Sequence, residues 1–358
     1  MKGAWCGLLA CGCWMLASCV NDFAALDKID AHVHINSSGS ALIDQAAADR
    51  FRLLTINVDY PDFPPIAEQS RIAQALSSAH PALLVWAATF SMQGWDDPNW
   101  QGLVIQDLDA EFKAGAVGVK VWKNIGMSSR DAEGRLIMID DAKFDPVFEF
   151  IRARHRVLIG HQGEPYNCWL PLSEMTVAND REYFREHPQY HMFLHPELPS
   201  YEQQMAARDR MLDRNPHLKF MGAHMASLEW NVDKLATFLD RYPDAVVDLA
   251  ARLGQVQFQS QQDLDKVRQF FIRYQDRLLY GTDLSQDPGA DPVKLRREAH
   301  ETWLRDWWYL ATRRSFSVPE LNGPVHGLGL PKNVVRKIYS ANAERWFDDP
   351  WHAAAAPL

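Results

Sequence analysis

The chain alternates between short apolar runs and longer stretches in which apolar positions recur every three or four residues. The short runs are typical of parallel strands that are buried on both faces. The longer stretches have the period of an amphipathic helix. The expected strands are Lys28–Ile35, Leu53–Val58, Ala82–Phe90, Gly118–Lys123, Val157–His161, Leu218–His224, Ala245–Ala250 and Arg277–Asp283. The expected helices are Ala41–Phe51, Ile66–Ser78, Ile105–Ala114, Phe144–Arg154, Tyr201–Arg214, Ser227–Arg241 and Leu264–Tyr274, followed by Leu295–Thr312 and Lys332–Trp346.

Eight strands that alternate with helices predict an α/β protein of the (β/α)8 TIM-barrel type. A doubly wound open sheet is the competing arrangement. It normally carries a Gly-rich phosphate loop after its first strand, and the sequence has no such loop there. No repeat, low-complexity tract or Gly/Ser linker divides the chain, so we expect one barrel domain over residues 19–358. The longest connection, residues 163–217, is rich in aromatic residues and histidine, and connections of this length are often lids.

The first nineteen residues have the pattern of an export signal. Lys2 provides a positive charge, and Gly7–Ala17 is an apolar run shorter than the about 20 residues that a membrane-spanning helix needs. The run leads into Leu16-Ala17-Ser18-Cys19, which resembles a bacterial lipobox. We therefore predict a lipoprotein signal peptide over residues 1–18 and a lipid anchor on Cys19. The alternative is a plain secretory peptide that is cut near Ala17 or Ser18.

This signal peptide predicts an exported bacterial protein of the periplasm or the outer membrane. Membrane contact is then expected through the N-terminal lipid only. The residue after Cys19 is not aspartate, which favours the outer membrane over the inner one. Four of the five cysteines lie within the first nineteen residues, so an acylated Cys19 leaves Cys168 as the one free thiol and excludes a disulfide within the monomer.

Composition narrows the possible partners. Apolar residues make up 47% of the 358 positions and charged residues 23%, which are ordinary values for a soluble globular protein. There are 46 acidic and 37 basic side chains, a net charge of −9. Proteins that bind nucleic acid usually carry a basic surplus, so we expect a small-molecule partner and no nucleic acid. Nothing in the sequence selects an oligomeric state.

Side chains of the kind that bind metals end several of the expected strands. His32 and His34 lie two residues apart on the first strand, so they face the same side, near the rim where barrel active sites lie. His161, His224 and Asp283 end the fifth, sixth and eighth strands. Each residue alone has an ordinary structural explanation. Together they predict a metal site, because imidazole and carboxylate groups are the ligands of divalent zinc.

The fourth expected strand adds a lysine to this set. If Gly118 and Trp122 face the barrel interior, Lys120 does so as well, because side chains alternate along a strand. A buried lysine has a lowered pKa, which allows it to act as a neutral amine or to react with carbon dioxide to form a carbamate. The structural alternative is an ion pair with an internal carboxylate.

With these residues in place, the sequence resembles the amidohydrolase superfamily, and most closely its amidohydrolase-2 (amidohydrolase-related) family. The segment Asp30-Ala31-His32-Val33-His34 is similar to the opening signature of the family, and the resemblance extends from about Lys28 to Trp346. The family contains hydrolases, lactonases and non-oxidative decarboxylases. Many of its decarboxylases lack the lysine of the fourth strand, so the lysine here favours the hydrolases.

The resemblance implies roles for individual residues. His32, His34, His161 and Asp283 match metal ligands of the family. His224 matches either a ligand of a second metal or a catalytic group. Lys120 occupies the position where members with two metals carry a carboxylated bridging lysine. The implied cofactor is one or two divalent ions, zinc or alternatively manganese.

Three functions are compatible with these features. The first is a hydrolase in which a metal-activated water attacks a carbonyl-type bond of a lactone, ester or amide. Asp283 then transfers the proton, His224 polarises the electrophile or holds a second metal, and Lys120 bridges two metals or binds an anionic substrate group. The second is a metal-dependent decarboxylase in which Arg252 or Lys123 grips the carboxylate of an acidic substrate. The third is a ligand-binding surface lipoprotein without catalysis, which the complete set of ligand-type residues disfavours.

Residues just past the strand ends are candidates for substrate binding. Aromatic faces offer rigid contact area for a ring or a sugar, and charged groups bind hydroxyls or carboxylates. Each of these residues also has a structural alternative, as core or as a solvated loop charge. The candidates are Trp122, Lys123, Glu164, Tyr166, Trp169, Glu229 and Arg252.

Overall fold

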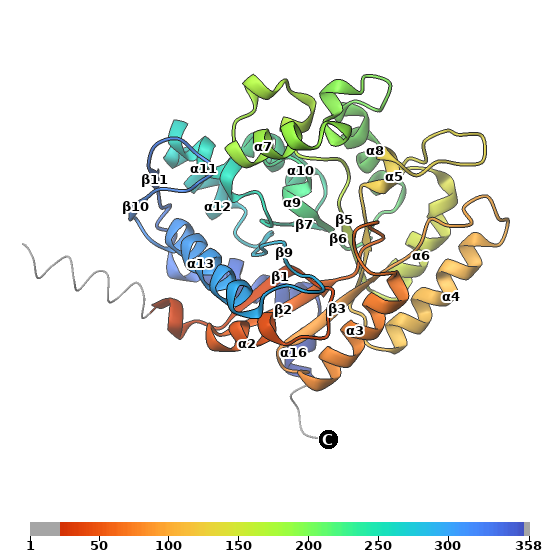
Figure 1. Ribbon diagram of the computed structural model, residues 1–358, viewed down its shortest axis with the longest axis horizontal. Coiled ribbons are helices and arrows are strands. Elements are labelled where there is room, and N and C mark those ends of the chain that lie inside the picture. Colours follow the sequence, from red (N-terminus) through yellow and green to blue (C-terminus); the bar gives the residue numbers. More distant parts are fainter. Residues whose placement is uncertain (1–21, 354–358) are drawn as a thin grey trace, which may run out of the picture.

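In the computed structural model, which describes residues 22–353, nine of the strands run parallel and form one curled sheet with helices on its outer side (Figure 1). The order of the strands is β8-β7-β6-β5-β4-β3-β2-β1-β9. The strands are β1 (Lys28–Ile35), β2 (Phe51–Ile56), β3 (Leu84–Thr89), β4 (Gly118–Val121), β5 (Val157–Gly160), β6 (Phe220–Gly222), β7 (Ala245–Asp248), β8 (Leu278–Leu279) and β9 (Leu284–Gln286). The signal peptide predicted over residues 1–18 and the anchor predicted at Cys19 lie outside the described residues.

Two short strands together make the eighth strand position. The break between β8 and β9 covers Tyr280–Asp283, and backbone hydrogen bonds to β1 continue across it. Ala31 N donates to Tyr280 O at 2.9 Å, and Asp283 N donates to His32 O at 2.7 Å. The sheet therefore closes on β1, and the predicted (β/α)8 class is confirmed. The break leaves the Asp283 side chain at the rim.

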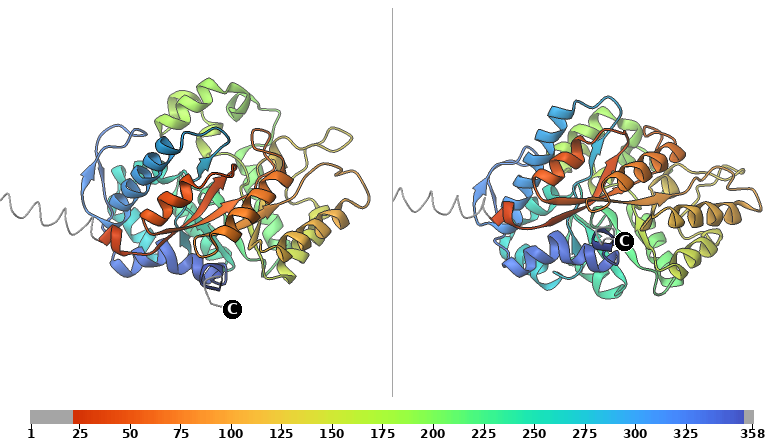
Figure 2. Two further views of the ribbon diagram at one scale, coloured as in Figure 1. Left: turned by 60° about the horizontal axis from the view of Figure 1, so that its bottom comes forward. Right: turned by 90° about the horizontal axis from the view of Figure 1, so that it is seen from below.

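Helices cover the outside of this sheet (Figure 2). None of the helices in residues 22–353 has the length and apolar character that a membrane crossing requires. The main helices are α2 (Ala41–Ala48), α3 (Ile66–Ala79), α4 (Trp100–Lys113), α6 (Asp145–Ala153), α8 (Tyr201–Arg214), α10 (Val232–Arg241), α11 (Leu253–Gln262), α12 (Leu264–Arg273) and α13 (Pro292–Ala311).

Several helix ends differ from the expected ones for local reasons. The helix expected from Ser227 begins only at Val232, because the Asn231 side chain accepts hydrogen bonds from the first two free N–H groups after it and caps the helix there. The first expected helix ends at Ala48, and Phe51 already belongs to β2. Helix α11 was not predicted, because its buried positions include glutamine as well as apolar residues.

The long connection after β5 forms a cap with a small core of its own. It contains α7 (Ala178–Glu186), which lies above the barrel in Figure 1. Cys168, Met175, Phe184 and Met192 form a buried cluster in this segment. The Cys168 thiol is free and fully buried, and it donates to Tyr190 O at 3.0 Å. The segment is therefore packed and is not an open loop.

A bulge in β1 decides which of its side chains face the barrel interior and which face the helices. The register with β2 shifts between Asp30 and Val33. Ile29 and Ala31 pack in the barrel interior, whereas Val33 and Ile35 pack in the cluster between the sheet and the helices. The extra residue turns Asp30 outward and leaves the two histidines of the strand facing inward, and such bulges often lie next to active sites.

The outward-facing Asp30 makes α13 part of the support of the site. Trp303 on α13 is fully buried, donates from Nε1 to Asp30 Oδ2 at 2.9 Å, and stacks on Phe51 with ring centroids 4.4 Å apart. Replacing Trp303 by Phe is expected to lower the free energy of unfolding by about 2–4 kcal/mol, because a cavity and a lost hydrogen bond to a buried carboxylate add together. Urea denaturation measures the change. The matched control is Trp308→Phe on the half-buried side of the same helix, and equal losses in the two variants would contradict the explanation.

Candidate active site

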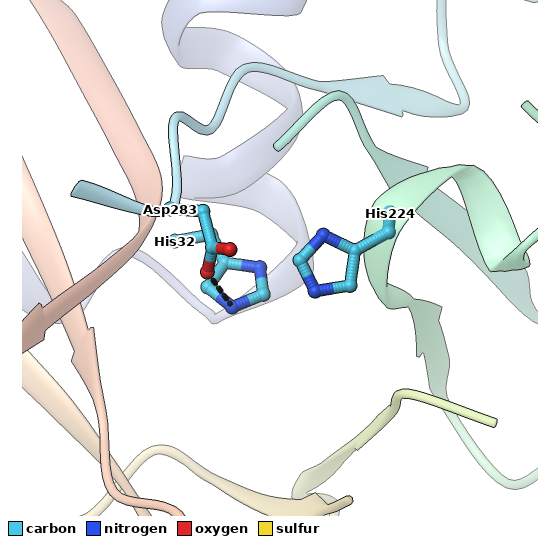
Figure 3. Close-up of side chains that lie close together, drawn as sticks. All are labelled: His32, His224 and Asp283. Atoms are coloured by element: carbon cyan, nitrogen blue, oxygen red, sulfur yellow. Dashed lines mark ion pairs between the residues drawn. The ribbon is translucent and has the colours of Figure 1, made fainter. Parts of the chain in front are cut away.

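Three side chains from different strands converge at the rim of the barrel (Figure 3). One ligand atom from each of His32, His224 and Asp283 lies within 4.8 Å of the others. Asp283 Oδ1 lies 3.3 Å from His32 Nε2 and 3.1 Å from His34 Nε2. The two histidines of β1 therefore do face inward together, as their spacing predicts, and they share one carboxylate oxygen.

The other ring nitrogen of each of these histidines is held from behind. His32 Nδ1 lies 2.9 Å from Asp248 Oδ2. His34 Nδ1 lies 2.7 Å from Ile56 O, and His224 Nδ1 lies 2.9 Å from Ala250 O. An acceptor at Nδ1 fixes the tautomer in which Nδ1 carries the proton, so each Nε2 turns a lone pair toward the centre. This is the outer support that metal-binding imidazoles have in proteins.

His161 completes the group at the end of β5. Its ring centroid lies 4.2 Å from that of His224. Its Nε2 is buried and has no hydrogen-bond partner among the described residues. Buried polar atoms are almost always paired, so an imidazole nitrogen left free among other lone pairs points to a cation as the missing partner. The residues present therefore fit a divalent metal of the zinc type.

The protonation states also suit a metal. Burial lowers the pKa of His32, and burial together with nearby positive charge places the pKa values of His161 and His224 well below the usual value. Burial alone would raise the pKa of Asp283, but His224 and the hydrogen bond with His34 hold it well below its usual value. Neutral imidazoles and an ionised carboxylate are the forms that bind metals.

The backbone around His224 is unusual. His224, Met225, Ala226 and Ser227 all have φ between 56° and 58°, a left-handed turn without a single glycine. Such a conformation costs about 1–2 kcal/mol per residue and requires support. Tyr201 donates its hydroxyl to Ser227 O, and a buried Arg208 donates to Ala226 O at 2.6 Å. Strain of this kind clusters at functional sites, and here it aims His224 at the centre.

Lys120 lies on the inner face of β4, as predicted. It is 1% exposed, and its Nζ is 3.3 Å from His32 Nε2. Burial is the main cause that lowers its pKa to about 8, although the carboxylates of Asp248 and Asp283 oppose this shift. The amine is therefore partly neutral near neutral pH and lies next to the imidazole of His32.

Asp248 is the functional residue that the sequence reasoning missed. It is fully buried at the end of β7, where Oδ2 contacts His32 Nδ1 and Oδ1 accepts the N–H of His224 at 2.7 Å and of Ala250 at 3.1 Å. Burial opposes ionisation, but the contact with His32 lowers its pKa overall. The available signal was its place as the single carboxylate within the seventh apolar run, Ala245–Ala250.

Four of the expected substrate-binding residues form two supported pairs. Lys123 and Glu164 make a close, largely buried ion pair. Tyr166 N donates to Glu229 Oε1 at 2.8 Å, and burial raises the pKa of Glu229 to about 7. Glu229 Oε2 is buried without a partner among the described residues, so this carboxyl group has an unused hydrogen-bonding position.

The remaining three candidates differ from one another. Trp169 donates from Nε1 to Pro199 O at 3.3 Å and packs edge-on against Tyr201, which indicates a structural role. Trp122 is half-buried and packs on Tyr60, with ring centroids 4.6 Å apart. Arg252 is 9% exposed, and its Nε has no partner among residues 22–353. Its charge contributes, after burial, to the lowered pKa values of His161 and His224.

Fold and site together place side chains of the kind that bind metals at the strand ends of a barrel. The family model described as Amidohydrolase matches residues 29–348, and the chain belongs to this family. Members act on small molecules and generally bind a divalent metal, so the protein is an enzyme of the metal-dependent amidohydrolase type. No curated protein is similar enough to match.

Two similar solved structures support the fold. One is an uncharacterized TIM-barrel protein, Bb4693, from Bordetella bronchiseptica, with 14% identity, a TM-score of 0.52, and coverage of 90% of this chain and 99% of that one. The other is 2,6-dihydroxybenzoate decarboxylase from Rhizobium, with 14% identity, a TM-score of 0.50 and the same coverage. At such identities the likeness extends to the fold and not to the reaction.

Proposed function

We propose that this protein is a hydrolase that cleaves a carbonyl-type bond of a small molecule, a lactone, ester or amide. The observation that carries the proposal is the group of histidine Nε2 atoms around Asp283. In His32, His34 and His224 the Nδ1 atom has a hydrogen-bond acceptor, and the Nε2 atom of His161 is buried without a partner among the described residues. A divalent ion, zinc or alternatively manganese, supplies Lewis acidity when bound and lowers the pKa of a water molecule to about 7.

In this proposal the ligands are His32, His34, His161 and Asp283. If two ions bind, His224 would hold the second, and Lys120 would supply a further ligand after its amine adds carbon dioxide and loses a proton to form a carbamate. His224 Nδ1 already faces a carbonyl, so its Nε2 is an acceptor, which favours a ligand role over donation to a substrate oxygen.

Asp283 is the proposed proton carrier. Its Oδ1 faces the β1 histidines, and its side chain is 32% exposed, so the carboxylate also borders accessible space. An ionised carboxylate there accepts a proton from the attacking water and returns it to the leaving group. Its lowered pKa keeps it ionised at neutral pH.

The proposed substrate contacts lie around this group. Glu229 offers a free buried oxygen, and Arg252 offers a free buried N–H. Trp122, Tyr166 and the Lys123–Glu164 pair would form the walls, and Trp169 would support them. We further propose that residues 1–18 export the protein and that Cys19 anchors it by a lipid in the periplasm or at the outer membrane.

Chelation tests the proposal directly. The protein is dialysed against a chelator and assayed on panels of lactones, esters and amides, with and without added zinc or manganese. Activity is expected to fall roughly tenfold or more after chelation and to return with metal, because water activation depends on the ion. His32→Ala is expected not to recover, whereas His326→Ala, an exposed histidine, behaves as wild type. Full activity in metal-free protein would overturn the proposal.

A metal-dependent decarboxylase is the second candidate. The observation that favours it is Arg252, a buried guanidinium with a free Nε near His161 and His224, which is suited to holding a substrate carboxylate. Release of carbon dioxide without consumption of water would distinguish this reaction from hydrolysis. A ligand-binding role without catalysis is disfavoured, because every ligand-type residue is present.

A further inference from the structure

A polar cavity lies on the outer side of the barrel wall. It has a volume of about 260 Å³ and is bounded by the end of β7, the break between β8 and β9, and helices α11 and α13. Leu249 is one of its wall residues and belongs to the hydrophobic cluster between sheet and helices, so the cavity is outside the barrel interior. Figure 1 shows α11 and α13 on the same side of the barrel.

Polar groups without partners face this cavity. Gln257 on α11 is 2% exposed, yet its amide makes no hydrogen bond with any of residues 22–353. Asp306 on α13 is 7% exposed and accepts the Tyr280 hydroxyl at Oδ2 at 2.8 Å, while its Oδ1 has no partner in the described chain. Because both residues line the cavity, these atoms are available to a polar occupant.

Charged groups of both signs line the same cavity. Arg305 and Glu320 are half-buried, and neither side chain makes an ion pair or hydrogen bond with another described residue. Arg305, Asp306 and Glu320 therefore face one and the same cavity. A simple anion would meet two carboxyl groups, and a simple cation would meet the guanidinium. A molecule that carries both charges satisfies each group.

We propose that this cavity binds a small zwitterion of the α-amino acid class. Its carboxylate pairs with Arg305, its ammonium group pairs with Asp306 and Glu320, and Gln257 bonds a further polar atom. The volume of about 260 Å³ lies just below the about 300–1,000 Å³ of pockets for drug-sized ligands, which suits a smaller molecule. Guanidinium groups recognise carboxylates through paired hydrogen bonds, which gives the orientation.

The cavity touches the back of two loops of the active site. Ala251 and Thr282 are wall residues of the cavity. Their chain neighbours are Ala250, whose carbonyl oxygen faces His224 Nδ1, and Asp283. None of the proposed metal ligands lines the cavity, so the site is separate from the metal group and the proposal does not depend on the hydrolysis reaction.

Isothermal titration calorimetry on the whole protein tests the site. Glycine, L-serine, L-glutamine and L-arginine are titrated separately up to about 10 mM. At least one is expected to bind saturably. Its N-acetyl and its carboxamide derivatives, which each lack one charge, are expected to bind roughly tenfold more weakly or not at all.

Variants locate the binding. Arg305→Gln is expected to weaken binding roughly tenfold, and Glu320→Gln roughly fivefold, because each removes one charge partner. The matched control is Arg297→Gln, which removes the same charge from an exposed position of α13 and should leave binding unchanged. Circular dichroism checks that each variant folds. If Arg305→Gln does not fold, the affinity of Glu320→Gln tests the location of the site. The proposal would be overturned if none of the four amino acids bound, or if the derivatives bound as tightly as the parent. It would also be overturned if Arg297→Gln weakened binding as much as Arg305→Gln. The cavity would then be one that holds water only.

Discussion

Replacing Asp283 by Asn is expected to lower kcat/KM about 10²–10⁴-fold, the range that general acid–base catalysis supplies. The amide keeps the shape of the side chain but carries no charge and does not accept a proton under these conditions. It also weakens the metal site, because an ionised oxygen lies 3.3 Å and 3.1 Å from the two β1 imidazoles. Steady-state kinetics at saturating zinc separates lost proton transfer from lost metal, and metal analysis reports occupancy.

The control for this variant is Asp287→Asn. Asp287 is an exposed carboxylate four residues further along the chain, and it accepts hydrogen bonds from Asn36 and Ser285 and not from an imidazole of the described residues. It should retain wild-type activity. A metal-loaded Asp283→Asn protein with more than roughly a tenth of the wild-type kcat/KM would contradict the proposed proton carrier.

The barrel and the converging strand ends could be predicted because both depend on periodicity. Near-continuous apolar runs predict parallel strands, and parallel strands end at one rim, so His161, His224 and Asp283 had to meet there. Alternation on β4 likewise predicted that Lys120 faces inward, and the structure confirms this with 1% exposure.

Other parts of the site depend on departures from periodicity. Strict alternation would put Asp30 on the same face as His32, but the bulge in β1 turns it outward to Trp303. The left-handed turn that begins at His224 contains no glycine from which it could be predicted, and hydrogen bonds from residues distant in the sequence support it. Tertiary contacts of this kind override local preference, so a single sequence does not reveal them.

The role of Asp248 also depends on tertiary contacts that the sequence does not reveal. Nothing in Val247-Asp248-Leu249 separates a supporting carboxylate from a strand-end cap, because its role depends on which atoms it meets. In the structure it holds the ring of His32 and the backbone of His224, so one carboxylate orients two imidazoles. Asp248 is a positioning residue and not a catalytic one.

Replacing Asp248 by Asn is expected to weaken zinc binding about 10–100-fold, the usual effect of removing such outer support. Oδ1 must still accept the N–H of His224 at 2.7 Å, so the new NH2 group faces His32 Nδ1. An NH2 donor there favours the tautomer in which Nε2 carries the proton, and a protonated Nε2 does not bind metal. Competition with a chromogenic zinc chelator measures the dissociation constant.

The matched control is Asp244→Asn. Asp244 also contacts a histidine, His217, at 3.3 Å, but at the opposite end of the same strand, and its side chain is 49% exposed. It should leave zinc affinity unchanged, because exposed pairs of this kind contribute little. A tautomer effect also predicts that the zinc dissociation constant of Asp248→Asn changes while its secondary structure does not. Wild-type zinc affinity in Asp248→Asn would show that His32 is oriented by the strand alone, and the bulge in β1 would then be the device that aims it.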